Sequence, residues 1–183
     1  MKKAMGFHFK VDALMSQAVE KLKKEGAEVI EIDFPLSPDA EKASFQVLLY
    51  EFKDGLNNYF KSLGPSAPIK NVNELIAFNK KDTVELAWFD QKTLETAAAK
   101  GDLKSAEYLK SLEIMHSATR EKGIDKIMQQ NKLDALMVPT GAPAWKTDFT
   151  DGDLYLGGNS SWAAISGYPN ITVPMGFIDE LPV

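Results

Sequence analysis

The sequence predicts a helix-rich α/β protein. Two long segments repeat apolar residues at the three- and four-residue steps of a helix, and three short apolar runs have the length and flanking residues of strands. Hydrophobic residues make up 44% of the 183-residue chain and charged residues 26%, which is ordinary for a globular protein. We therefore expect residues 1–183 to form one domain with a real core.

The first third of the chain carries the clearest patterns. Apolar residues over 11–22 predict a helix that Gly26 ends in a left-handed conformation. Residues 27–34 then alternate like a strand near solvent. A second helix is expected from Pro38 to Leu63, because a serine and a proline start it and a glycine and a proline stop it.

The middle of the chain predicts shorter elements. We expect Asn73 to cap a short helix through Phe78, and a further helix over 93–99. A longer helical stretch should run over 102–130. The apolar run 133–138, which is bounded by a proline, is interpreted as a buried strand.

The composition changes at Pro139. Of the 21 basic residues 20 precede it, whereas five of nine prolines and six of twelve glycines lie at or after it. We therefore distinguish a helix-rich part, 11–138, from a Pro/Gly-rich part, 139–183, whose backbone suits close approach to other backbone or to a ligand. In the second part we expect a short helix ended by Gly167 and a final strand at 171–173.

Charge and composition exclude several classes of function. A net charge of −5 and a single arginine argue against a nucleic-acid partner, and no apolar stretch approaches the length of a membrane span. The absence of cysteine excludes thiolate zinc sites and a cysteine nucleophile. His8 and His116 are isolated, so we expect no metal and no cofactor. Cysteine usage fits a cytoplasmic location as well as a secreted one, and we favour the cytoplasm.

Several ordered segments carry a family resemblance. The chain resembles the C-terminal portion of the amidase signature family in Leu133–Thr140 followed by Gly141–Trp145 and Asp148, in Gly157–Ser161, in Ala163–Phe177, and upstream in Glu51–Tyr59 and Asn73–Asn79. The resemblance implies a mixed, mostly parallel β-sheet flanked by helices. It also implies hydrolysis of carbon–nitrogen bonds by a serine nucleophile, which a second serine in a cis peptide linkage and a lysine activate.

The catalytic residues of that family belong to a Gly/Ser-rich segment upstream of the part that this chain resembles. We therefore expect an incomplete amidase domain that has no catalytic residue and is inactive alone. The string Gly157–Ser161 could suggest a nucleophile loop, but no strand–turn–helix elbow precedes it and no lysine follows Lys146. We interpret Ser160 or Ser161 as a helix cap instead.

The resemblance implies that this portion forms a wall of the substrate cleft. The loop before the small-residue helix should approach the far end of a small-molecule amide, since glycines let backbone N–H groups come close to a ligand. The candidate substrate-binding residues are Gly157, Gly158, Asn159, Trp145, Asp148 and Phe78. Alternatives remain open for three of them: Trp145 and Phe78 as core aromatics, and Asp148 as a turn acceptor.

Two other functions remain open. The chain could be a non-catalytic interaction module, or a fragment of an amidotransferase A-type subunit that supplies ammonia to a charged tRNA. Strands that lack neighbours would leave backbone groups unpaired. We therefore expect the chain to associate with its missing N-terminal part or with a second copy.

Overall fold

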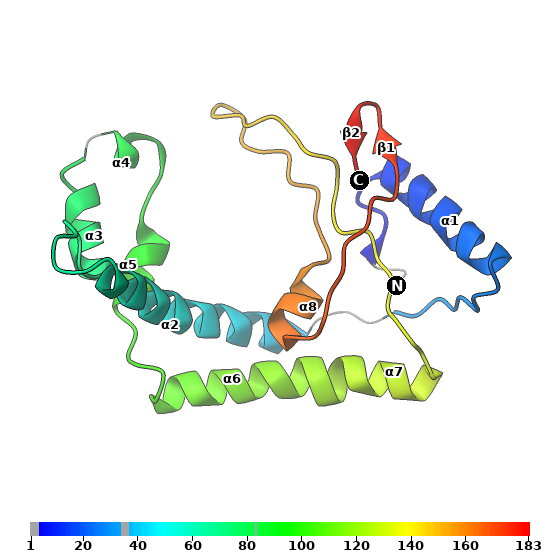
Figure 1. Ribbon diagram of the computed structural model, residues 1–183, viewed down its shortest axis with the longest axis horizontal. Helices are drawn as coiled ribbons and strands as arrows, with labels where there is room; N and C mark the ends of the chain where they lie inside the picture. Colours follow the sequence, from blue (N-terminus) through cyan, green and yellow to red (C-terminus); the bar gives the residue numbers. More distant parts are fainter. Residues whose placement is uncertain (1–3, 34–36, 83) are drawn as a thin grey trace. The chain divides into compact units, whose positions relative to one another are not determined.

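The computed structural model describes residues 4–33, 37–82 and 84–183 (Figure 1). The chain divides into two compact units. Unit 1 combines the two ends of the chain, Met1–Ser37 and Ser117–Val183, and unit 2 is the central stretch Pro38–His116.

Helices make up most of the regular structure. They are α1 (Phe9–Lys24), α2 (Pro38–Ser62), α3 (Val72–Asn79), α4 (Glu85–Trp88), α5 (Lys92–Ala98), α6 (Ala106–Thr119), the π-helical turn η2 (Arg120–Ile124), α7 (Asp125–Asn131) and α8 (Ser161–Ser166). Two short strands, β1 (Phe177–Ile178) and β2 (Leu181–Pro182), form an antiparallel hairpin.

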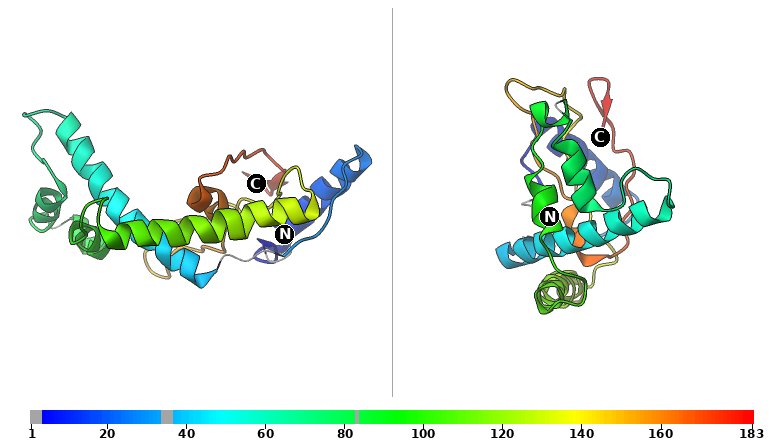
Figure 2. Two further views of the ribbon diagram at one scale, coloured as in Figure 1. Left: turned by 90° about the horizontal axis from the view of Figure 1, so that it is seen from below. Right: turned by 90° about the vertical axis from the view of Figure 1, so that its left-hand side faces the viewer.

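Unit 2 is built on the long helix α2, against which α3 and α5 pack (Figure 2). One face of α2 is buried, and its most enclosed large side chain, Leu49, is 1% exposed. Two reciprocal hydrogen bonds then join α2 to α6. The Tyr50 hydroxyl donates to Glu107 and the Tyr108 hydroxyl donates to Glu51, each over 2.8 Å. The core of unit 2 is therefore apolar, with a polar seam along one side.

Hydrogen bonds and burial in the polar seam shift the pKa values of two of its groups. Hydrogen bonds from Tyr50 and then from Lys100 lower the pKa of the Glu107 carboxyl below its usual value. Burial, reinforced by the Glu51 carboxylate, raises the pKa of Tyr108. Both shifts favour the protonation states that form the seam at neutral pH, a neutral phenol and an ionised carboxylate.

In unit 1, α1 packs close to the β1–β2 hairpin (Figure 1). Val11 and Met15 are buried on one face of α1. At its start, Lys10 forms an ion pair with Asp179 of the hairpin turn over 3.2 Å. A Cβ added at Gly176 would lie 2.9 Å from the Leu14 side chain, so the segment just before the hairpin touches the helix directly.

The expected strands are not formed in the described residues. Residues 27–33, 133–138 and 171–173 have no strand pairing there, and Phe34, the end of the first predicted strand, lies outside the described residues. A strand needs hydrogen-bonded neighbours, and the apolar pattern that predicts one does not supply them. The described part of the chain therefore contains the β1–β2 hairpin and no mostly parallel sheet.

The helical predictions are mostly confirmed. α1, α2 and α5 match the predicted helices within a few residues, and Gly26 has the expected left-handed φ of +94°. The short helix over 72–79 is capped by Asn71, so the prediction of Asn73 as the cap is wrong. The stretch predicted over 102–130 begins later, at Ala106, and contains the π-helical turn η2.

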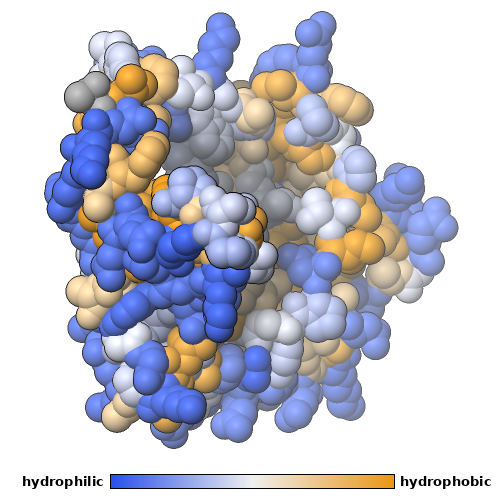
Figure 3. All heavy atoms as spheres, turned by 60° about the vertical axis from the view of Figure 1, so that its left-hand side comes forward, coloured by the Kyte–Doolittle hydropathy of each residue, from blue (hydrophilic) through white to orange (hydrophobic). Residues whose placement is uncertain are grey.

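Hydrophobic side chains reach the surface at several places. On the face shown in Figure 3, they lie between hydrophilic ones. Exposed apolar side chains occur on helices and on extended segments, and include Phe45, Tyr59, Trp88, Ile171, Val173 and Phe177. No helix in the described part of the chain is both long enough and apolar enough to cross a membrane.

Candidate functional site

The predicted cleft-wall loop pairs with the segment after the apolar run 133–138. Gly158 forms an antiparallel bridge with Gly141, and the Asn159 backbone N–H donates to the Thr140 carbonyl over 3.0 Å. Residues separated by almost twenty positions are thereby held side by side just before α8. The loop Gly157–Asn159 is therefore fixed by main-chain hydrogen bonds.

The Asn159 side chain completes this junction. Its Nδ2 amide donates to the Pro139 carbonyl over 2.8 Å and to the Ala4 carbonyl over 2.9 Å. An asparagine amide has two N–H donors, and both are used here. The side-chain atom of Asn159 that remains suited to a ligand is the acceptor Oδ1.

The two glycines of the loop meet close neighbours. Gly157 has a φ of +114°, which side chains rarely adopt, and it faces the ring of Phe7. A Cβ at Gly158 would lie 3.1 Å from the Thr140 carbonyl oxygen and 3.4 Å from the Tyr155 hydroxyl. Any larger residue at Gly158 must push one of these groups away.

Trp145 lies on the extended chain that leads away from the junction. Its ring meets Tyr155 edge-on, with centroids 5.7 Å apart. The side chain of Trp145 is 41% exposed. The structure therefore places Trp145 on an accessible aromatic pair, so it is not a buried core residue.

Asp148 accepts hydrogen bonds within its own turn. Its carboxylate accepts from the backbone N–H groups of Thr150 over 2.8 Å and Asp151 over 2.9 Å. These two bonds lower the pKa of the Asp148 carboxyl. Asp148 therefore acts as a turn acceptor, as the alternative interpretation expected, and its contribution to substrate binding stays a prediction.

Phe78 belongs to unit 2, so the structure does not place it relative to the Gly157–Asn159 loop. It lies near the end of α3 and is 54% exposed, which makes the interpretation as a core residue wrong. The structure therefore brings Gly157, Gly158 and Asn159 together with the backbone of 139–141, and leaves Phe78 as a separate exposed aromatic.

The two serines of the loop differ in their positions. Ser160 occupies the position before α8, but its side chain makes no capping hydrogen bond, so the prediction of a serine side-chain cap is wrong for it. Ser161 is the first residue of α8. The backbone carbonyl of Ser160, rather than its hydroxyl, takes part in the helix by accepting from Ala164 over 3.2 Å.

A polar cluster that the sequence analysis did not identify surrounds the end of α8. The Arg120 guanidinium donates through Nε to the Ser166 carbonyl over 2.7 Å and lies over the ring of Tyr168. The Tyr168 hydroxyl donates to Asp125 over 2.6 Å, and this bond raises the pKa of Tyr168. The signal available in the sequence was that Arg120 is the only arginine.

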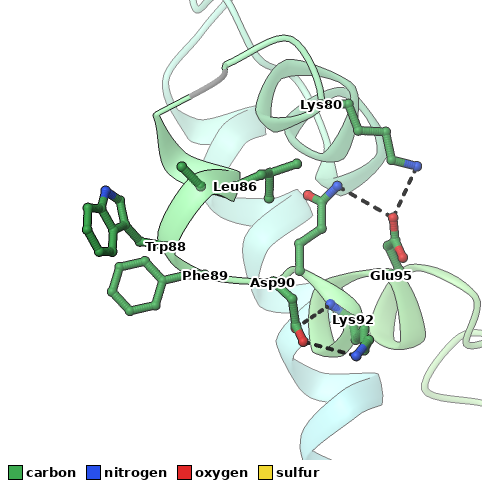
Figure 4. Close-up of a pocket in the computed structure, with 9 residues that line it drawn as sticks. Lys80, Leu86, Trp88, Phe89, Asp90, Lys92 and Glu95 are labelled. Carbon is green, nitrogen blue, oxygen red and sulfur yellow. Dashed lines mark hydrogen bonds and ion pairs between the residues drawn. The ribbon is translucent and has the colours of Figure 1, made fainter. Parts of the chain in front are cut away.

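Unit 2 contains an open cavity of about 430 Å³ beside α4, the helix that the sequence analysis did not predict (Figure 4). Trp88 and Phe89 project from its rim, and ion pairs of Lys80 with Glu95 and of Lys92 with Asp90 lie on the opposite side. Backbone and side-chain hydrogen bonds from Lys92 lower the pKa of the Asp90 carboxyl. The cavity is shallow, and none of the six candidate residues lines it.

Known proteins are similar to this chain over nearly its whole length. The family model for Amidase matches residues 2–183. A probable amidase of Arabidopsis thaliana is 31% identical over 182 residues, which cover 96% of this chain and 32% of that protein.

Solved structures show the same relationship. A peptide amidase in complex with the competitive inhibitor chymostatin is 37% identical, with a TM-score of 0.84 over 93% of this chain and 35% of that one. Native peptide amidase from Stenotrophomonas maltophilia is 36% identical, with a TM-score of 0.80 over 93% of this chain and 34% of that one. This chain spans about a third of the length of the proteins it matches, and its fold is part of the fold that they share. By the extent of the family match, the chain belongs to the Amidase family.

Proposed function

We propose that this chain is the C-terminal scaffold and substrate-cleft wall of an amidase, which hydrolyses carbon–nitrogen bonds with a serine nucleophile supplied by residues outside this chain. By this proposal the chain is an incomplete domain and does not hydrolyse amides alone. The observation that carries the proposal is the family match over residues 2–183 of a chain that spans about a third of its relatives.

The chemistry of amide hydrolysis supports a separate location for the nucleophile. A serine attacks an amide only when a base accepts its proton and fixed donors stabilise the oxyanion. Ser160 lies just before α8 and Ser161 is its first residue, and no lysine follows Lys146 in the sequence. Among the described residues, neither serine side chain forms a hydrogen bond to a lysine or histidine that could act as this base.

In the proposed cleft wall, the junction at Gly157–Asn159 contacts the part of the substrate that is remote from the scissile bond. Asn159 Oδ1 would accept a hydrogen bond from the substrate, and the exposed pair Trp145 and Tyr155 would supply an apolar contact. Two of the similar solved structures are of peptide amidases. Short peptides that end in a C-terminal amide are therefore the first substrates to test.

The proposal also concerns the extended segments. Residues 171–173 expose Ile171 (86%) and Val173 (66%), and the described residues offer them no strand partner. We propose that they pair with strands of the missing N-terminal part, which would cover the apolar side chains and satisfy the backbone.

The test compares this chain with a longer protein that extends it at the N-terminus by the family's Gly/Ser-rich segment. Both are treated with a serine-directed activity probe and assayed for ammonia release from a C-terminally amidated dipeptide. We expect labelling and turnover with the longer protein only. A third sample, in which the N-terminal part is added as a separate polypeptide, should recover part of the activity.

The matched controls are Ser160→Ala and Ser161→Ala. In the longer protein both variants should keep the labelling, because neither hydroxyl is the proposed nucleophile. Labelling of this chain alone that disappears in either variant would place the nucleophile in the loop and overturn the proposal.

A further inference from the structure

The end of α8 is held by a clamp of three side chains, Arg120, Tyr168 and Asp125. Arg120 Nε donates to the last carbonyl of the helix, that of Ser166, over 2.7 Å, and its guanidinium lies 5.9 Å from the centroid of the Tyr168 ring. On the other side, the Tyr168 hydroxyl donates to Asp125 over 2.6 Å. Tyr168 is thereby held at its face and at its hydroxyl.

A kink at the turn η2 lies between Arg120 and Asp125, which reach the same partner, Tyr168. In a regular α-helix, residues five positions apart point about 140° away from each other. A π turn closes hydrogen bonds between residues five apart, and here the Asp125 N–H bonds to the Arg120 carbonyl. The chain is kinked at this turn, so the regular α-helical angle does not separate the two side chains, and both contact Tyr168. Gly123, which is buried and has non-helical φ and ψ of −107° and −112°, lies inside it.

The clamp acts on a well-defined helix end. Ser166 is fully buried, and its hydroxyl accepts from the Tyr168 N–H over 3.2 Å and donates to the Ala163 carbonyl over 3.3 Å. Gly167 ends the helix with a φ of +70°, and a Cβ there would lie 3.3 Å from Arg120 Nη2. The guanidinium thus occupies space that any side chain at position 167 would need.

The other end of α8 is continuous with the junction. α8 has only six residues, and Asn159 lies two residues before its first residue. Such a short helix moves as one piece, so holding its last carbonyl also limits the movement of the loop before it. The junction itself is anchored to the backbone of 139–141.

We propose that Arg120, with Tyr168 and Asp125, is a positioning residue that holds α8 and therefore sets where the Gly157–Asn159 loop meets the remote part of the amide substrate. This inference rests on the proposed function. It predicts that the clamp governs the binding of long substrates and has little effect on the reaction of short ones.

The experiment uses the longer, active protein and two substrates, a C-terminally amidated tetrapeptide and the amide of a single acetylated amino acid. Arg120→Met removes the guanidinium but keeps an apolar chain of similar reach. We expect at least a tenfold rise in KM for the tetrapeptide amide, with kcat and the KM of the short amide within about twofold of the parent. Tyr168→Phe, which loses the bond to Asp125 alone, should raise the tetrapeptide KM three- to fivefold.

The matched control is Lys122→Met, which removes an exposed positive charge from the same π turn. It should leave both KM values unchanged. If Arg120→Met does not fold, the test rests on Tyr168→Phe. For this variant too, the KM for the tetrapeptide amide is divided by the KM for the short amide and compared with the parental ratio.

The outcomes separate the two proposals. An active protein whose Arg120→Met and Tyr168→Phe variants keep the parental ratio of KM values, or lose both substrates equally, overturns the positioning role alone. If the unmodified longer protein hydrolyses neither amide, the proposed function fails, and the positioning role fails with it.

Discussion

The two units of this chain are held together in different ways. In unit 2, helices pack along an apolar face of α2, and the tyrosine–glutamate bonds of the seam join residues 57 positions apart. In unit 1, the bond from Asn159 to Ala4 joins residues 155 apart and the ion pair of Lys10 with Asp179 joins residues 169 apart. Both units bury apolar side chains, and unit 1 adds polar contacts between segments that are far apart in the sequence.

This difference predicts which substitutions should lower the stability of each unit most. Buried apolar side chains contribute in proportion to the surface that they remove from water, so their truncation should damage unit 2 most. A buried carbonyl that loses its donor leaves a desolvation cost behind, so the removal of one amide should damage unit 1 most. The predictions below test this comparison, beginning with the largest effect.

The largest effect is expected for Leu49→Ala in α2. Leu49 is 1% exposed, so its truncation removes buried surface and leaves a cavity, at a cost of about 2–5 kcal/mol in the free energy of unfolding. Its neighbour Leu48 is 49% exposed, and Leu48→Ala should cost less than about 1 kcal/mol. Urea unfolding followed by circular dichroism measures both. Equal losses for the two variants would mean that α2 has no preferred buried face.

A smaller effect is expected for Asn159→Ala in unit 1. The change leaves the Ala4 and Pro139 carbonyls without their side-chain donor, which should cost about 1–3 kcal/mol. Hydrogen exchange of the Asn159 backbone amide, which donates to Thr140, should become faster as the junction opens. The control Asn170→Ala changes an exposed asparagine close to the end of α8 and should stay within about 0.5 kcal/mol. Unchanged amide exchange in Asn159→Ala would show that the main chain alone holds the junction.

The sequence predicts local structure well and long-range pairing poorly. The apolar steps in α1 and α2 follow the helix period, and both helices form where that period predicts them. The run 133–138 has an equally clear apolar pattern, but a strand also needs a neighbour, and the pattern does not name one. For the same reason the family resemblance, rather than the residue pattern, was the source of the expected sheet.

The candidate site shows the same limit. Glycines before a short helix indicate a close backbone approach, and Gly158 indeed lies against the Thr140 carbonyl. Nothing in the local sequence indicates that Asn159 would bond to residue 4. The clamp was missed because the chain is kinked between residues 120 and 125, whereas the pattern was interpreted with the period of a continuous α-helix.

The smallest effect concerns the start of α3, where structure and sequence interpretation differ by two residues. Asn71 Oδ1 accepts from the backbone N–H groups of Asn73 and Glu74, each over 3.0 Å, and Glu74 accepts in return from the Asn71 side chain. This arrangement resembles a capping box, except that Glu74 accepts from the Asn71 side chain and from the Lys70 backbone N–H, and the spacing of three between Asn71 and Glu74 is present in the sequence. Asn71→Ala should therefore cost about 1 kcal/mol in the free energy of unfolding.

Asn73→Ala is the matched control, because Asn73 is the same residue type, exposed, and inside α3. Alanine is the better helix former at an interior position, so this variant should be neutral or slightly stabilising. The measurement is the midpoint of urea unfolding for both variants under one condition. The slope of the free energy of unfolding against urea concentration should stay constant, because a constant slope indicates comparable unfolded states. A loss in Asn73→Ala with none in Asn71→Ala would return the helix start to Asn73.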